Sequence, residues 1–96
     1  MTTKEQQSMP RYIIEREVGD INLEDLPAVG RKSNEVLDSM DGVVWIRSYI
    51  SEAEGKIYCE YEAPDPEAVY EHARRAGLPA NKVSEIAMVI EPSMFR

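Results

Sequence analysis

Apolar and polar residues along this chain follow two periods, one of two residues and one of about 3.6 residues. Stretches rich in β-branched and aromatic residues, which are typical of strands, occupy residues 11–18, 43–53, 56–62 and 83–91. Apolar residues recur at helical spacing over residues 23–40 and 66–76. The pattern therefore predicts the element order βαββαβ.

Capping and turn residues separate these elements. Glu54–Gly55 predicts a tight turn between the second and third strands, because glycine supplies the positive φ that a hairpin turn needs. Asp65–Pro66 predicts the start of the second helix, with a side-chain acceptor at the cap and a fixed φ at the first position. The sequence offers two N-caps for the first helix, Asn22 and Asp25. Asp25 is an alternative because Pro27 would lie about one turn inside a helix capped by Asn22.

The order βαββαβ predicts an α+β, ferredoxin-like fold, with a four-stranded antiparallel sheet and both helices on one face. A chain of 96 residues fits one such domain, over residues 9–96, and rules out two. The polar residues 1–8 predict a disordered leader ahead of that domain.

The sheet face opposite the helices, the open face, is predicted to carry a mixture of aromatic, apolar and charged residues. Strand alternation predicts a helix-facing set of Val44, Ile46, Ile50, Ile57, Cys59, Ile86, Met88 and Ile90. The open face then holds Ile13, Val43, Trp45, Tyr49, Tyr58, Ala87 and Val89, together with Glu15, Arg47, Glu60 and Glu85. Because Trp and Tyr are enriched where one surface docks on another, we expect a homodimer packed sheet against sheet, a dimeric α/β barrel. The alternative is a lone domain with an amphipathic wet face.

Composition and charge exclude several classes of partner. The chain has 18 Asp plus Glu against 11 Lys plus Arg, a formal charge of −7, which disfavours nucleic acid. The longest apolar run, residues 43–46, is far below the roughly 20 residues of a membrane span, and residues 1–8 hold no signal-peptide core. One cysteine precludes an intrachain disulfide. We therefore expect a cytoplasmic protein that binds neither nucleic acid nor membrane.

His72 and Cys59 are the candidate metal ligands. His72 shares a helical stripe with Val69 and Ala73, so it is predicted to point toward the sheet, where Cys59 lies in the same layer. A thiolate paired with an imidazole suits a soft or borderline metal, although two ligands do not make a site. The alternative is a hydrogen-bonded core histidine and a small buried cysteine.

The best ligand-binding candidate is a set on the predicted open face that comprises Glu15, Trp45, Arg47, Tyr49, Tyr58, Glu60 and Glu85. A dimer would gather these carboxylates and phenols around a partly polar cavity able to bind a cation or orient a small molecule. The alternative is a set of solvated or interfacial ion pairs. The sequence contains no Gly-rich phosphate loop and no GxSxG, HExxH or CxxC motif.

Three stretches, residues 11–17, 55–59 and 71–85, resemble a family of short bacterial proteins of largely unknown function that is named for a nickel-binding member. The most specific part is the block His-Ala-Arg-Arg-x-Gly-x-Pro-Ala at residues 72–80. The resemblance implies a ferredoxin-like dimer and a divalent metal such as nickel, with His72 and Cys59 at positions that such relatives also fill with His and Cys. Nickel-binding members are richer in histidine along the first helix and second strand, whereas this chain has none there.

The sequence leaves three classes of function open. The first, which it favours, is a small binding protein that holds a metal ion or small ligand at or near a homodimer interface. The second is a cofactor-independent enzyme of the dimeric α/β-barrel type, a monooxygenase or isomerase, with Glu85, Tyr49, Tyr58 and His72 as candidate acids and bases. The third is a sensor or interaction module without chemistry.

Overall fold

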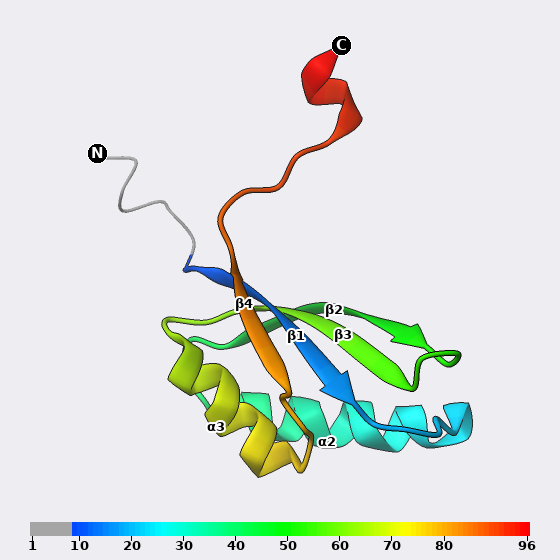
Figure 1. The fold of residues 1–96 in the computed structure, drawn as a ribbon. Helices are drawn as coiled ribbons and strands as arrows, with labels where there is room; N and C mark the ends of the chain where they lie inside the picture. The colour runs from blue at the N-terminus through cyan, green and yellow to red at the C-terminus, as the bar shows by residue number, and fades with distance from the viewer. Residues whose placement is uncertain (1–8) are drawn as a thin grey trace.

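The computed structural model describes residues 9–96 and has the predicted order of strands and helices (Figure 1). Its strands β1 (Arg11–Glu17), β2 (Val44–Ser51), β3 (Lys56–Glu62) and β4 (Lys82–Ile86) form an antiparallel sheet in the order β2-β3-β1-β4. Helices α2 (Leu26–Asp38) and α3 (Pro66–Ala76) lie on the same face of that sheet, which confirms the α+β, ferredoxin-like arrangement. The leader predicted over residues 1–8 lies outside the described residues.

The first predicted helix consists of two consecutive helical segments. A short 3-10 helix, η1 (Leu23–Asp25), precedes α2, and the Asn22 side chain accepts a hydrogen bond from the backbone N–H of Glu24 at 3.0 Å. Asp25 occupies the N-cap position of α2 without a side-chain cap bond, and Pro27 lies in the first turn, where its missing N–H costs little. Both candidate caps therefore mark starts, one for each segment.

Helix α3 begins and ends as its sequence predicts. The Asp65 carboxylate accepts a hydrogen bond from the backbone N–H of Ala68 at 2.9 Å. At the other end Gly77 adopts a φ of 72°, and the N–H of Leu78 donates to the carbonyl of Ala73 at 2.9 Å. This fixed helix brings His72 against the sheet, where it is fully buried.

A β-bulge in β2 changes which side of the sheet the start of this strand presents. One extra residue, Ile46, lies between the paired positions Trp45 and Arg47. The alternation before the bulge is therefore shifted by one residue. Val43 is buried in the core and Trp45 packs against it, whereas Val44 is 47% exposed. The prediction that Val43 and Trp45 lie on the open face and that Val44 faces the helices is wrong.

The last strand is shorter than predicted. β4 ends at Ile86 because its partner β1 begins at Arg11, and Pro10 before it has no N–H to continue the ladder. Glu85 pairs with the buried Tyr12, and Ile86 pairs with Arg11. Since paired residues share a face, Glu85 lies on the helix side and Ile86 on the open face, which is the reverse of the prediction.

Residues 87–96, the C-terminal arm, leave the sheet on the side away from the helices and end in the 3-10 helix η2 (Pro92–Phe95) (Figure 1). Five of its apolar side chains are more than half exposed: Met88, Val89, Ile90, Met94 and Phe95. The faces predicted for residues 87–90 are therefore wrong, because these residues have no partner strand and belong to neither face of the sheet.

The core fills the space between the sheet and the two helices. Its buried members are Tyr12, Ile14, Val43, Cys59, Tyr61, Ala63 and Val69, with Ile57 packed against them. The predicted helix-facing positions of Ile57 and Cys59 are thus correct. Neither helix within residues 9–96 is long and apolar enough to cross a membrane.

Candidate functional site

A pocket of about 230 Å³ lies between the sheet and α2. One part of its lining is apolar and consists of Leu26, Val29, Trp45, Ile50, Ile57 and Leu78. The other part carries polar groups and consists of Arg16, Ser33, Ser48, Cys59 and Tyr61. Apolar walls with a few convergent polar groups are the usual composition of a small-molecule site.

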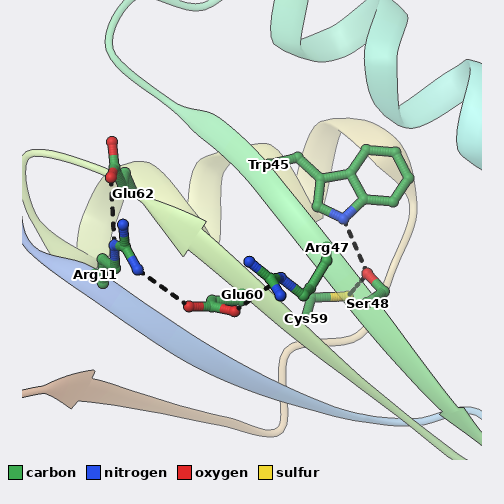
Figure 2. Close-up of polar contacts among 7 residues, drawn as sticks. All are labelled: Arg11, Trp45, Arg47, Ser48, Cys59, Glu60 and Glu62. Carbon is green, nitrogen blue, oxygen red and sulfur yellow. Dashed lines mark hydrogen bonds and ion pairs between the residues drawn. The ribbon is translucent and has the colours of Figure 1, made fainter. Parts of the chain in front are cut away.

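Trp45 forms one wall of the pocket because the β-bulge turns it inward. Its indole lies beside Gly30 on α2, where a Cβ would be 3.8 Å from Cη2, an ordinary van der Waals distance. The indole Nε1 donates a hydrogen bond to Ser48 Oγ at 2.9 Å, and Ser48 Oγ donates in turn to Cys59 Sγ at 3.0 Å (Figure 2). The bulge thereby connects the pocket wall to the buried sulfur.

Arg16 brings a positive charge into the interior. The alternation of β1 places it on the same side as Tyr12 and Ile14, and it is 1% exposed. Its Nε donates to Cys59 Sγ at 3.3 Å and its Nη1 donates to the carbonyl of Pro79 at 2.7 Å. The third nitrogen, Nη2, is buried without a hydrogen-bond partner. None of the ion pairs among residues 9–96 includes Arg16, so no carboxylate offsets this charge.

His72 lies beside this group, in the interior. Its Nε2 is 3.0 Å from Ser33 Oγ, its ring centroid is 5.2 Å from that of Tyr61, and its Nδ1 has no partner. Burial lowers the pKa of His72 below its usual value; the Ser33 backbone opposes this effect, and the positive Arg16 adds to it. The imidazole is therefore neutral near pH 7. Burial also raises the pKa of Tyr61, which stays a neutral phenol.

The two metal-ligand candidates share the buried layer but bond to different partners. Cys59 Sγ accepts hydrogen bonds from Arg16 and Ser48, whereas His72 bonds to Ser33. Within the part of the chain that the structure describes, no group of three or more His, Cys, Asp or Glu side chains is arranged to hold a metal ion. A complete metal site would therefore need ligands from outside these residues.

Charged residues on the open face pair with one another. The Glu60 carboxylate lies 3.5 Å from Arg11 Nη1 and 3.4 Å from Arg47 Nε, and Glu62 lies 3.3 Å from Arg11 Nε (Figure 2). Glu15 lies 3.7 Å from the ammonium of Lys56. These contacts agree with the ion-pair alternative for Glu15, Arg47 and Glu60.

The remaining ligand-binding and acid–base candidates are spread over separate surfaces. Tyr49 is 53% exposed on the open face. Tyr58 pairs with it across the strands and donates a hydrogen bond to Glu54, which raises the pKa of the Tyr58 phenol. Glu85 lies on the helix side of the edge strand β4, and His72 lies in the interior. The fold does not bring Glu85, Tyr49, Tyr58 and His72 together as one acid–base site.

Four polar residues of the interior were not among the predicted site residues: Arg16, Ser33, Ser48 and Tyr61. The sequence contains a signal for Arg16, because it alternates with Tyr12 and Ile14 and so is a charged residue at an inward position. Ser48 and Ser33 carry no comparable signal, since a serine on a strand or helix is commonplace on either face. Their roles depend on the neighbours that the fold supplies.

Comparison with known proteins places the chain in a family. The family described as "Nickel responsive protein SCO4226-like" matches residues 12–86. The chain belongs to this family. The resemblance seen in the sequence is thereby confirmed, and the matched region contains every residue of the pocket but not the C-terminal arm.

A solved structure of the SCO4226-like family is similar to this one. The crystal structure of SCO4226 from Streptomyces coelicolor A3(2) superposes with a TM-score of 0.74 at 25% sequence identity. The match covers 83% of this chain and 99% of that chain. No curated protein matches the sequence significantly.

The depressed pKa of His72 predicts a pH dependence of stability. Unfolding restores the ordinary pKa of about 6.5, so the unfolded chain binds a proton that the folded chain does not as the pH falls through this value. We expect the free energy of unfolding to fall between pH 7.5 and pH 5.5, by at most about 1.4 kcal/mol per pH unit. Urea unfolding measures this slope. The His72→Gln variant should lack it, and an equal slope in both proteins would contradict the assignment.

Proposed function

We propose that this member of the SCO4226-like family binds a small, largely apolar molecule in the pocket between the sheet and α2. The observation that carries the proposal is the lining itself, in which apolar side chains from α2, β2 and β3 face a few convergent polar groups. A volume of about 230 Å³ is below the roughly 300–1,000 Å³ of drug-sized sites, so the ligand is small.

The packing around Gly30 supports a binding role for this space. Protein interiors are packed as densely as organic crystals, and unfilled apolar volume costs stability. A larger residue at position 30 would fill the pocket and would also favour the helix, since glycine costs about 1 kcal/mol relative to alanine there. The chain instead keeps a glycine beside Trp45 and leaves the volume open.

The Gly30→Leu variant tests the pocket directly. We expect it to abolish binding of small apolar ligands such as octan-1-ol, because the new side chain occupies the pocket. Its melting temperature should be unchanged or higher, because helix propensity and apolar burial both increase. Fluorescence of Trp45, the one tryptophan of the chain, reports binding. Ala28→Leu, an exposed position on the same helix, is the matched control and should bind like wild type. Wild-type affinity in Gly30→Leu would refute the site.

A divalent metal ion such as nickel is the second candidate ligand. Two observations favour it: the buried Nδ1 of His72 lacks a hydrogen-bond partner, and the family is described as nickel responsive. Cys59 lies in the same buried layer and is the other candidate ligand from this chain. The described side chains do not complete a site, so further ligands would have to come from water or from groups outside residues 9–96.

Isothermal titration with nickel chloride tests this second candidate. We expect the His72→Gln variant to bind nickel at least tenfold more weakly than wild type, because the only imidazole of the chain is lost. The same titration of Glu54→Gln, on the exposed hairpin, controls for nickel held weakly by exposed carboxylates. Equal nickel affinities in wild type and His72→Gln would remove His72 from the metal site.

A homodimer through the open face of the sheet completes the proposal. A twofold interface must be complementary to itself, and the row Glu62, Arg11, Glu60 and Arg47 alternates in charge as such an interface requires. Exposed Tyr49 and the exposed apolar residues of the C-terminal arm add surface that water solvates poorly. Two such sheets packed face to face would form the dimeric α/β barrel that the sequence predicts.

Two exposed tyrosines on opposite sides of the molecule provide a matched test of the homodimer. Tyr49 is 53% exposed on the open face, and Tyr70 is 46% exposed on α3. We expect Tyr49→Ser to weaken dimerisation at least tenfold, since interfacial tyrosines are frequent hot spots, and Tyr70→Ser to leave it unchanged. Light scattering over a dilution series measures the dissociation constant. A wild-type monomer at micromolar concentration would contradict the dimer.

A further inference from the structure

We propose that the ligand of this pocket is a small organic monocarboxylate, whose carboxylate pairs with the buried guanidinium of Arg16 and whose apolar part fills the rest of the pocket. This inference rests on the proposed small-molecule function and adds the chemical class of the ligand. It assigns to Arg16 the recognition of the anionic group.

An anion beside Arg16 would stabilise its buried charge. A guanidinium cannot lose its proton in a protein, and a buried charge without a partner is costly. Arg16 is 1% exposed, and its acceptors are the sulfur of Cys59 and the carbonyl of Pro79. Neither is a carboxylate, and no Asp or Glu among residues 9–96 forms an ion pair with it. The counter-charge is therefore missing from the described part of the chain.

The hydrogen-bonding capacity of Arg16 points to the same ligand. Two of its nitrogens, Nε and Nη1, donate hydrogen bonds, whereas Nη2 is buried without a partner. Arg16 is also one of the residues that line the pocket. The hydroxyls of Ser33 and Tyr61 also belong to the polar part of the lining. A carboxylate has two acceptor oxygens, so it can take the guanidinium proton with one and a hydroxyl proton with the other.

Charge and volume select a monocarboxylate over other anions. One guanidinium offsets one negative charge, so a phosphate dianion would bring a second, unpaired charge into the interior. The neighbouring imidazole does not supply a second positive charge, because burial and Arg16 keep His72 neutral. The pocket of about 230 Å³ and its apolar wall, which includes Leu26, Trp45 and Leu78, admit a medium-chain fatty acid or an arylacetate.

A matched pair of ligands tests the inference on the wild-type protein. Octanoate and octan-1-ol have the same chain length and differ in the charged head group. We expect octanoate to bind about ten- to a hundredfold more tightly, the usual gain of a hydrogen bond to a charged group, as measured by Trp45 fluorescence and calorimetry. In NMR spectra the Arg16 Nε–H signal should shift with octanoate and stay in place with octan-1-ol.

The Arg16→Met variant keeps an unbranched apolar stem and removes the charge. We expect it to bind both ligands with equal affinity, close to that of octan-1-ol for wild type. If wild type binds the two ligands equally, the carboxylate inference is wrong while the small-molecule site stands. If wild type binds neither ligand, the proposed function itself fails. Because the ligand comparison uses wild type, it decides the question even if Arg16→Met does not fold.

Discussion

The buried guanidinium of Arg16 is the interaction on which the interior of this protein depends. It ties β1 to Cys59 on β3 and to Pro79 between α3 and β4, so three parts of the chain that are far apart in sequence meet at one side chain. Its charge also helps to keep His72 neutral. A domain of this size has a free energy of unfolding of only about 5–15 kcal/mol, and an unpaired buried charge lowers it. A binding role gives a physical reason to keep an arginine at a position where methionine would pack.

The β-bulge at Ile46 determines on which face of the sheet the side chain of Trp45 lies. Without the extra residue, Trp45 would lie on the open face, and the pocket would lose a wall. With it, the indole reaches Gly30 on α2 and donates to Ser48, which in turn bonds the sulfur of Cys59. The same shift removes an aromatic residue from the open face, so a partner copy would meet fewer aromatic groups there.

Within residues 9–96, charged side chains of the sheet form ion pairs on its open face and none on its helix side. On the open face Glu60 and Glu15 each have a cation within 4 Å, and because these cations are partly exposed to water, the pairs weaken with salt. On the helix side Arg16 has no carboxylate within 4 Å among residues 9–96. The chain has a net charge of −7, yet the uncompensated charge in the interior of its described part is positive. The sequence predicted a ligand site on the open face of the sheet, whereas the candidate pocket of the structure lies between the sheet and α2.

The sequence by itself determined the element order, the caps of α3, the hairpin at Gly55 and the helix-facing side of Cys59, because each follows from local spacing or backbone preference. Only the tertiary structure decided the faces of Trp45 and Glu85 and the end of β4. Pairing register and a bulge depend on the partner strand, and a one-residue shift exchanges the two faces. The unpaired state of Arg16 Nη2 was likewise beyond the sequence, because it depends on which groups from β3 and from the loop after α3 come within reach.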